Sequence, residues 1–337
     1  MRVAIVHDGS VAQPEADKGA DERLLTKSVL SSVALVEEAL RVHDHDVRRV
    51  AYEGLDEFLG HDPDETDVIF NLVDSIGGSD AKGVAFVGLL DLLGVPYTGN
   101  GLAALSLSRD KHRAKGVMRA YGVRTVPGWL AVKLDGDAIV TPDDKLRFDP
   151  SDFPLIVKPS RADASAGISQ SSVCRDADAL RERVEFVLSE FGPALIEQFI
   201  EGREFHVSVV GDGVALPVSE IKFTDDAEGE DVLTKDAKWD EESDDYARTV
   251  PECPAKDCPE SVSEMAVQAY KAMGCRDYAR VDMRMSEDGT IVVLEINPNP
   301  AIDDCSGLVL SARAAGKTFD ELIEMIVGYA KARGEKK

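Results

Sequence analysis

Basic residues are scarce in this chain. Its 337 residues include 38 lysines and arginines against 63 aspartates and glutamates, which gives a formal net charge of −25 at pH 7. A surface of this sign repels the phosphate backbone of DNA and RNA, so we expect no nucleic-acid partner. A small anionic ligand is still compatible with this composition if a few lysines and a metal ion gather in one cleft.

Several other features are absent. No apolar run approaches the ~20 residues that cross a bilayer, and the strand-like start at residues 2–6 is unlike a signal peptide, so we expect a cytoplasmic protein without membrane contact. The five cysteines are an odd number and form no C-x-x-C pair, so we expect reduced thiols and no zinc site. Neither the H-E-x-x-H motif nor the G-x-G-x-x-G fingerprint occurs, which leaves a zinc protease or a dinucleotide-binding fold with little support.

What the sequence does contain is a pair of apolar runs near its end. Residues 280–285 and 290–297 are rich in β-branched residues, and Gly289 lies in the short segment between them. This pattern predicts an antiparallel β-hairpin. Four polar residues interrupt the two runs: Arg280, Asp282, Glu295 and Asn297.

The carboxylates of this hairpin need compensation if they are buried, because an unpaired buried charge is very unfavourable. Strand side chains alternate between faces, so Glu295 and Asn297 share one side of their strand. Two carboxylates and the amide oxygen of Asn297 form an all-oxygen set that suits Mg²⁺. The alternative is an edge hairpin whose polar side faces water, which is the commoner explanation of a single aspartate. Arg280, Asp282, Glu295 and Asn297 together favour the metal site.

Residues 1–99 alternate predicted strands and helices. We expect strands at 3–7, 47–52 and 67–72, and helices at 27–43 and 83–93. This alternation is typical of a parallel sheet, whose ligands bind beyond the carboxyl ends of the strands. Two glycine-containing loops, 7–10 and 74–80, follow predicted strands and are therefore candidates for ligand contact.

Later segments add further candidates. An apolar strand at 154–158 ends in Lys158, and the small residues of 160–167 follow, an arrangement that can cover phosphates although such a lysine is usually solvated. Residues 223–257 are acidic with little periodicity, which is typical of a functional or mobile loop. We also expect helices at 110–122, 176–190, 259–274 and 319–330, strands at 127–133, and a hairpin over 205–216.

Short motifs in the same order along nearly the whole chain resemble the D-alanine–D-alanine ligase family of ATP-grasp enzymes. They are D-V-I-F-N at 67–71, G-G at 77–78, P-Y-T-G at 96–99, D-K at 110–111, V-K-P-S at 157–160, I-E at 196–197, G-R-E at 202–204, A-K-W at 237–239, R-V-D at 280–282 and E-I-N at 295–297. Each motif is common alone, and their order and spacing carry the resemblance. It implies an α/β ATP-grasp fold with an N-terminal open α/β domain over 1–99, a small α+β lid domain over 100–197 and a C-terminal α+β catalytic domain over 198–337.

The resemblance also implies a role for each matching residue. The residues expected to bind ATP are three lysines at its phosphates, Lys111, Lys158 and Lys238, and two acids at its adenine and ribose, Glu197 and Glu204. The expected magnesium ligands are Asp282, Glu295 and Asn297. The expected catalytic residues are Arg280, which would steady the tetrahedral intermediate, and Ser165, which lies in the matching phosphate loop.

The family reaction implies the ligands of the chain. ATP phosphorylates a carboxylate to an acyl phosphate, and an amine then attacks it, so we expect ATP, Mg²⁺ or alternatively Mn²⁺, and small carboxylate and amine substrates. A homodimer is compatible with this expectation. Phosphoryl transfer depends more on metal and lysine charge than on a general base, which agrees with the hairpin's composition.

Departures from the family pattern are concentrated at the first amino-acid site. The phosphate loop has Asp163, Ala164 and Ser165 where the family has a glycine and two serines. Asp74 replaces a histidine, Trp239 replaces a tyrosine, and we expect both at the substrate site. Ala301 replaces a glycine, and Ser306 falls where a serine would bind the carboxylate of the second substrate.

Three interpretations therefore stay open. The first is an ATP-dependent carboxylate–amine ligase whose acyl substrate is uncertain. The second is an authentic D-alanine–D-alanine ligase whose pocket tolerates these changes. The third is a catalytically silent nucleotide-binding module, against which Arg280 argues, because that arginine has no role in holding ATP alone.

Overall fold

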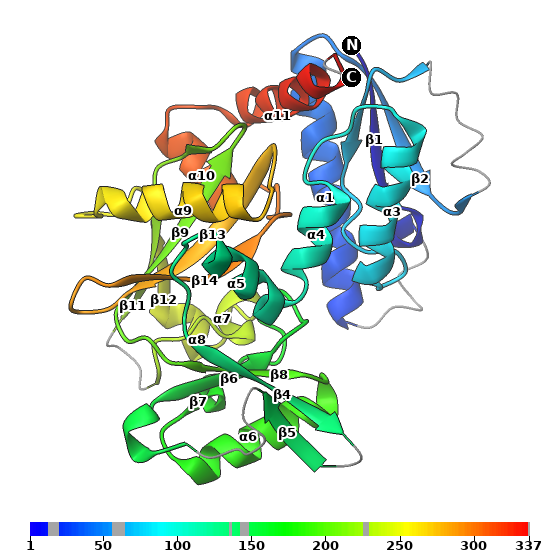
Figure 1. Cartoon of the computed structure of the whole chain (residues 1–337). Helices are drawn as coiled ribbons and strands as arrows, with labels where there is room; N and C mark the ends of the chain where they lie inside the picture. Colours follow the sequence, from blue (N-terminus) through cyan, green and yellow to red (C-terminus); the bar gives the residue numbers. More distant parts are fainter. Residues whose placement is uncertain (13–19, 56–64, 135–136, 142–147, 225–228, 336–337) are drawn as a thin grey trace.

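The computed structural model describes residues 1–12, 20–55, 65–134, 137–141, 148–224 and 229–335. Within these residues the chain forms three β-sheets, each with helices on at least one face (Figure 1). No helix in this part of the chain is long and apolar enough to cross a membrane. All five cysteines are free thiols, as predicted.

The N-terminal sheet is parallel, as the alternation of strands and helices predicted. Its central strand β1 (Arg2–Asp8) lies between β2 (Asp46–Tyr52) and β3 (Val68–Asn71). The surrounding elements are η1 (Gly9–Ala12), α1 (Ala20–Val42), α3 (Asp80–Leu93) and α11 (Phe319–Gly334). Val3 and Ile5 pack toward α1 and α11, whereas Ala4 and Val6 pack toward α3. Because β1 is covered on both faces, its sequence is a continuous apolar run.

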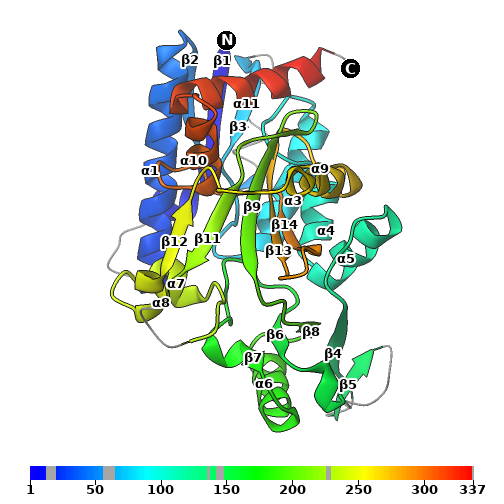
Figure 2. The same cartoon turned by 90° about the vertical axis from the view of Figure 1, so that its left-hand side faces the viewer.

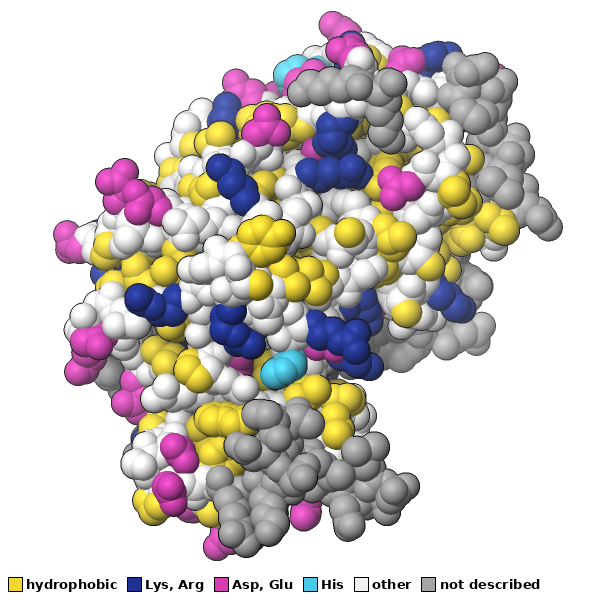
Figure 3. Space-filling model, in the orientation of Figure 1, with side chains coloured by type: hydrophobic (Ala, Val, Ile, Leu, Met, Phe, Trp, Pro, Cys, Tyr) yellow, Lys and Arg dark blue, Asp and Glu magenta, His cyan; other side chains and the backbone are white. Residues whose placement is uncertain are grey.

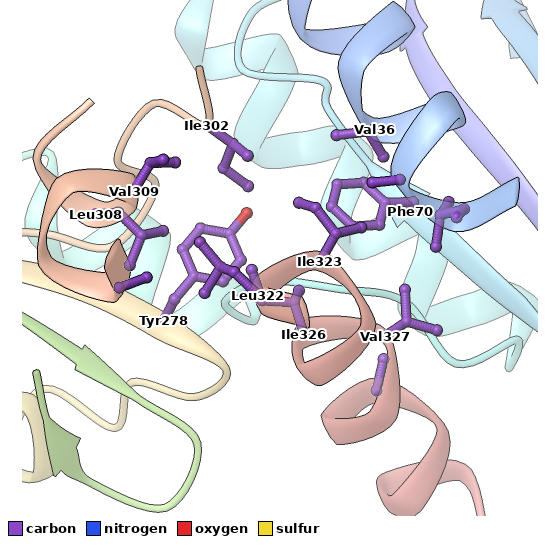
Figure 4. Packing of buried hydrophobic residues seen from close by; sticks show 14 of the residues in the cluster. Val36, Phe70, Tyr278, Ile302, Leu308, Val309, Leu322, Ile323, Ile326 and Val327 are labelled. Carbon is purple, nitrogen blue, oxygen red and sulfur yellow. The ribbon is translucent and has the colours of Figure 1, made fainter. Parts of the chain in front are cut away.

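Helix α11 joins the first sheet to the C-terminal hairpin. In Figure 4, Ile323 points toward Phe70 of β3, and Leu322 points toward Tyr278 at the start of the hairpin. The side chains of Leu322 and Ile323 are both fully buried in this cluster. The last helix therefore fixes the position of the hairpin relative to the loops that follow β1 and β3.

The largest sheet carries the predicted hairpin. Its strand order is β12-β11-β9-β13-β14, and β10 pairs with β9. The strands are β9 (Arg203–Val210), β10 (Val214–Ala215), β11 (Ser219–Phe223), β12 (Thr249–Glu252), β13 (Tyr278–Met285) and β14 (Ile291–Asn297). On one face this sheet packs against α5 (Lys111–Ala120) and α9 (Glu260–Ala272) in a shared apolar core. The opposite face of β9, β13 and β14 carries polar side chains.

The third sheet forms a lid. Its strand order is β5-β4-β8-β6-β7, and α6 packs against it. The elements are β4 (Gly128–Leu134), β5 (Asp137–Thr141), η4 (Pro150–Asp152), β6 (Leu155–Pro159), η5 (Gln170–Ser172), β7 (Val173–Cys174), α6 (Ala177–Glu190) and β8 (Ala194–Gln198). Figures 1 and 2 both show this sheet at one end of the molecule, next to the large sheet. The three domain ranges predicted from the sequence stay a prediction.

The prediction of a loop without regular structure over 223–257 was wrong in part. This segment contains α7 (Lys235–Trp239), α8 (Asp244–Arg248) and strand β12, while 225–228 lie outside the described residues. The two helices have five residues each, so they are too short to show a helical period. Thr234 and Ser243 cap them by accepting hydrogen bonds from backbone N–H groups. The sequence also gave no sign of α4 (Leu102–Ser108) or α10 (Gly307–Ala314).

The charges of the molecule are distributed unevenly. Although the net charge is −25, many lysine and arginine side chains are visible across the middle of the face in Figure 3. Helix α5 and its flanks contribute Arg109, Lys111, Arg113, Lys115, Arg119 and Arg124, with Asp110 as the one acid between residues 109 and 124. The acidic chain therefore contains a basic helix, and two lysines of that helix reach the site described next.

Candidate active site

The polar side chains of three neighbouring strands lie on one face of the large sheet. In the antiparallel register, Asp282 is opposite both Glu295 on β14 and His206 on β9, Arg280 is opposite Asn297, and Arg284 is opposite Glu204. Residues directly opposite each other in neighbouring strands project to the same face. The predicted metal and catalytic residues of the hairpin are therefore brought together on this face.

A β-bulge at Leu294 maintains this separation of polar and apolar faces. The pairing shifts between Asp282 and Met283, so that Val293 lies opposite Met283. Val293 and Ile296 both pack in the apolar core, although a regular strand would place residues three apart on opposite faces. The extra residue, Leu294, lines a pocket on the polar side.

Arg280 holds Asp282 in a bidentate ion pair. The guanidinium Nε lies 2.7 Å from one carboxylate oxygen and Nη2 lies 2.9 Å from the other. Burial raises the pKa of Asp282, but Arg280, His206 and Lys238 together outweigh this effect and the pKa falls to about 2. Asp282 is therefore ionised near neutral pH despite its burial.

The donor set of the hairpin fits a hard divalent cation. Asp282 and Glu295 are cross-strand partners, and Asn297 lies on the same face with its amide oxygen 2.8 Å from the backbone nitrogen of Asn299. That oxygen has a second lone pair, so the protein can supply three oxygen ligands. Among the described residues, no group of three or more His, Cys, Asp and Glu side chains is arranged to hold a metal, so the amide oxygen is needed to complete the protein's share.

Lys111 connects the predicted phosphate loop, residues 160–167, to Glu295, one of the predicted metal ligands. Its ammonium nitrogen lies 2.5 Å from the carbonyl oxygen of Ala162, 3.2 Å from Asp163 and 3.4 Å from Glu295. Burial of Glu295 raises its pKa, and Lys111 is the largest of the charges that lower the pKa again, to about 2. Two segments that are far apart in sequence thus share one lysine.

Lys158 and Glu197 lie next to each other in the lid. The ammonium of Lys158 lies 2.7 Å from one carboxylate oxygen of Glu197, and Lys115 of α5 contacts the other oxygen. Glu197 is 1% exposed, and burial raises its pKa, but Lys115 and Lys158 outweigh burial and lower it. The carboxylate is therefore enclosed by two ammonium groups.

Glu204 is held from two sides. Arg284 donates to one of its oxygens from Nε at 3.0 Å and from Nη2 at 2.9 Å, and His206 Nε2 lies 3.2 Å from the other oxygen. Burial raises the pKa of Glu204, but Arg284 and His206 lower it to about 2. Arg284 also donates to the backbone carbonyls of Ile200 and Asp231, which connects the lid to the segment after β11.

Several of these groups line one pocket between the lid and the large sheet, whereas the predicted residues Lys111, Arg280 and Asn297 lie outside its lining. Its polar lining includes the predicted residues Lys158, Ser165, Glu197, Glu204, Lys238, Asp282 and Glu295. Its apolar lining includes Val126, Ile156, Ile168, Phe199, Ile200, Val232, Leu233 and Leu294. An apolar lining with a few converging polar groups is typical of a small-molecule binding site.

The predicted phosphate loop, residues 160–167, contributes Ser165 to the lining of this pocket. Ala164 and Ser165 have positive φ angles of 54° and 58°, and the hydroxyl of Ser165 donates to the carbonyl oxygen of Leu233 at 2.9 Å. Burial and the neighbouring Arg280 both lower the pKa of Lys238, which enters the pocket from α7. The loop, α7 and the hairpin therefore meet at one place.

Other predicted residues lie outside the lining of this pocket. Asp74 accepts a hydrogen bond from Asn299 at 2.9 Å, two residues after Asn297. Ser306 precedes α10, and a Cβ at Gly307 would lie 3.9 Å from Arg280, so the start of that helix is beside the arginine predicted to be catalytic. The backbone of Trp239 ends α7, and its side chain lies outside the described part of the structure.

Three residues of the site were missed by the sequence analysis. Lys115 lies four residues after Lys111, so both occupy the buried stripe of α5, a signal that helical spacing could have given. Arg284 continues the alternation of Arg280 and Asp282 and could have been found in the same way. His206 lies two residues after Glu204 on β9, so the same alternation could have placed both on one face, whereas its position opposite Asp282 depends on strand pairing.

Comparison with known proteins agrees with this geometry. Residues 126–328 match the family described as D-ala D-ala ligase C-terminus. A D-alanine–D-alanine ligase of Cupriavidus pinatubonensis is 32% identical over 251 residues, which cover 72% of this chain and 70% of that protein. The uncharacterized protein y4sG of Sinorhizobium fredii is 31% identical over 290 residues, covering 83% of this chain and 80% of its own.

Solved structures of two ligases have a similar fold. A crystal structure of the D-alanine–D-alanine ligase from Bacillus anthracis has a TM-score of 0.75 at 24% identity, covering 100% of this chain and 99% of that one. The structure of the VanG D-Ala:D-Ser ligase from Enterococcus faecalis has a TM-score of 0.69 at 19% identity, covering 98% and 99%. The chain therefore belongs to the D-alanine–D-alanine ligase family, and its fold is the ATP-grasp fold of these enzymes.

Proposed function

We propose that this chain is an ATP- and Mg²⁺-dependent ligase that joins a small carboxylate to an amine, with an acyl substrate different from D-alanine. The observation that carries the proposal is the pairing of Asp282 with Glu295 on the face that closes a pocket lined by Lys158 and Lys238. Carboxylates and lysines in one pocket suit a nucleoside triphosphate with its metal ion. Mn²⁺ suits the same oxygen ligands.

The proposed reaction has two steps. An oxygen of the substrate carboxylate takes the γ-phosphoryl group of ATP, and ADP leaves. The nitrogen of the amine then attacks the acyl carbon, inorganic phosphate leaves, and the nitrogen loses a proton. Bound Mg²⁺ would supply charge neutralisation for the phosphates, and Asp282, Glu295 and Asn297 would hold it.

Each residue of the site would have its own role in this reaction. Lys111, Lys158 and Lys238 would neutralise phosphate oxygens, while Glu197 would lie at the adenine side and Glu204 would hold the ribose hydroxyls. Arg280 would stabilise the charged tetrahedral intermediate, and the hydroxyl of Ser165 would donate to a phosphate oxygen. The start of α10, with Ser306, lies beside Arg280 and would receive the carboxylate of the second substrate.

The first substrate is where the proposal departs from the names of the relatives. Asp74 and Asp163 occupy positions where the family has a histidine and a glycine, and Trp239 stands in place of a tyrosine. Such changes alter both the charge and the hydrogen-bonding groups that face an amino acid. The second candidate is D-alanine dimerisation itself, which the name of the Cupriavidus relative favours.

A substrate screen tests both candidates. ADP release would be measured with ATP and Mg²⁺ in the presence of amino acids and other small carboxylates, one and two at a time. The proposal expects ADP release that needs both a carboxylate and an amine, with Glu295→Gln as the inactive control. ADP release without any carboxylate, or none with any pair, would contradict it. The screen would include D-alanine pairs, whose use as the best substrate would favour the second candidate.

We also propose that the partners are small molecules alone, with no nucleic acid or membrane, and that the protein works in the cytoplasm, where ATP and Mg²⁺ are available. A homodimer is the proposed assembly, and sedimentation would test it.

A further inference from the structure

Helix α5 directs two lysines into the protein. Its buried residues are Lys111, Ala114, Lys115 and Met118, which recur at the spacing of one helical face. The side chain of Lys115 is only 2% exposed. A fully buried ammonium is very unfavourable unless an opposite charge compensates it, so the partner of Lys115 decides what this residue can do.

That partner is Glu197. The ammonium of Lys115 contacts one carboxylate oxygen, while the ammonium of Lys158 lies 2.7 Å from the other. Strands β6 and β8 pair so that Glu197 is opposite Ile156, which puts Lys158 diagonally across from it on the same face. The three charges therefore form a row that runs from the inside of α5 to the pocket, which Lys158 and Glu197 line and Lys115 does not.

The room for this row is made by Gly128. A Cβ at that position would lie 2.9 Å from Glu197 Cγ and 2.9 Å from the carbonyl oxygen of Ile196. Real Cβ atoms essentially never approach so closely, so any side chain here would displace Glu197. The contact between Lys115 and Glu197 thus depends on the absence of a side chain on β4.

The charges of the row determine what Lys158 can offer to a ligand. Two ammonium groups and one carboxylate leave one positive charge. If Lys115 were removed, Glu197 would compensate Lys158 alone, and the row would present no net positive charge to an anion. Lys158 can therefore act on an anionic ligand only while Lys115 compensates Glu197.

We propose that Lys115 is a positioning residue for the phosphates of the nucleotide, which acts through Glu197 on Lys158 and does not itself touch the ligand. This inference rests on the proposed function, because it assumes that the pocket binds ATP. It assigns a role in nucleotide binding to Lys115, and it explains how this lysine would act on Lys158 through Glu197.

Burial agrees with this role. It lowers the pKa of Lys115 to about 8. The charge of Glu197 raises this pKa, and the charge of Lys158 lowers it further. Glu295 on β14 also acts on the same ammonium from the large sheet. Below about pH 8 the row keeps its extra positive charge, and above it the charge is lost. Nucleotide affinity should therefore fall as pH rises through this region.

Calorimetric titration of the full chain with a non-hydrolysable ATP analogue and Mg²⁺ tests the proposal. The variants are Lys115→Met, Glu197→Gln, Lys158→Met and the double variant Lys115→Met/Glu197→Gln. We expect Lys115→Met to weaken binding by roughly tenfold, and the double variant to bind within about threefold of Glu197→Gln. Lys115→Arg should restore part of the affinity, because it keeps the charge.

A matched control separates positioning from a general change of charge. Lys271→Met removes an exposed lysine of α9 and should leave the affinity unchanged. Melting temperatures of all variants show whether each is folded. In the wild type the affinity should fall above about pH 8, and this fall should be absent in Lys115→Met.

The outcomes are distinct. If Lys115→Met binds as tightly as the wild type, the inference is wrong. It is also wrong if Lys115→Met weakens binding equally with and without Glu197→Gln, because the lysine then does not act through that carboxylate. If the wild type binds no ATP analogue at all, the proposed function fails instead. Loss of binding in Lys158→Met alone would leave the proposed function standing and overturn only the role of Lys115.

Discussion

Asp282 on β13 lies directly opposite Glu295 on β14, one position before the bulge at Leu294. Two carboxylates at neighbouring cross-strand positions would repel each other in an ordinary sheet. Here Arg280 binds the first and Lys111 lies near the second. The pair is thus held ionised by two cations from different parts of the chain, and it is available to a divalent ion.

Removing a metal ligand should stop turnover without unfolding the protein. In Glu295→Gln and Asn297→Ala we expect ATP turnover to fall by at least about 100-fold, because each change removes a hard oxygen ligand. Mn²⁺ binding, followed by its paramagnetic resonance signal in the presence of an ATP analogue, should weaken in parallel. Glu287→Gln changes an exposed acid in the turn of the same hairpin and should leave both quantities unchanged. Turnover near the wild-type level in both ligand variants would rule out the metal assignment.

Adding a methyl group at Gly128 should weaken nucleotide binding without changing any charge. Gly128→Ala places a Cβ 2.9 Å from Glu197 Cγ, so the carboxylate must move away from its two lysines. We expect a higher KM for ATP and a lower melting temperature. Gly116→Ala on α5 has no atom within 4 Å of the added Cβ and serves as the control. An unchanged KM for ATP in Gly128→Ala would show that the carboxylate can shift without consequence.

Arg284 should be important for stability, because it is the main compensation of a buried carboxylate. Arg284→Met leaves Glu204 buried beside His206, and we expect the free energy of unfolding to fall by about 3–5 kcal/mol. Arg313→Met breaks an exposed ion pair with Asp304 and should cost less than about 1 kcal/mol. Denaturant titration measures both. Equal losses in the two variants would mean that burial of Glu204 does not need the arginine.

The ionised carboxylate of Glu204 also predicts how the free energy of unfolding changes at acidic pH. The pKa of Glu204 is about 2 in the folded protein and 4.5 as its ordinary value, so its ionised form stabilises the folded state. This contribution is fully present above pH 4.5 and is lost as pH falls toward about 2. The free energy of unfolding should therefore fall more steeply with acid in the wild type than in Glu204→Gln. Identical slopes between these pH values would contradict the ion pair.

D-alanine pairs should be poor substrates. Ala164 and Trp239 take the places of family hydroxyls, and losing a hydrogen bond to a charged group costs ~1.5–3 kcal/mol, so two losses lower kcat/KM by roughly two to four orders of magnitude. The measurement is kcat/KM for D-alanine beside other pairs. Ala164→Ser should raise this value if the missing hydroxyl is responsible. A value for D-alanine above those of all other pairs would restore the family name as the activity.

Much of the fold was predictable because its signals are local. The helical stripe of α6, the alternation in the C-terminal hairpin and the buried strand β1 all follow from side-chain period alone. Asp282 and Glu295 could be recognised as a pair because a short turn fixes which strands meet. These features need no knowledge of the rest of the molecule.

Other features depend on contacts between distant segments, and the sequence does not show them. The run Ile291-Val292-Val293-Leu294 is apolar throughout, so nothing in it marks Leu294 as the bulge residue. The partner of Lys115 comes from strand β8, and His206 lies opposite Asp282 only because β9 pairs with β13, so these relationships appear only when the strands are paired. Helices α7 and α8 are shorter than the window in which a helical period can be counted.

The central claim is that ATP activates a carboxylate through an acyl phosphate, and isotope transfer tests it most directly. The best carboxylate from the substrate screen would be labelled with ¹⁸O in its carboxyl group and supplied with ATP, Mg²⁺ and the amine. We expect one labelled oxygen in the inorganic phosphate for each ADP released. The Glu295→Gln variant should release neither ADP nor labelled phosphate. Inorganic phosphate that carries no label, while ADP and product still form, would rule out an acyl phosphate.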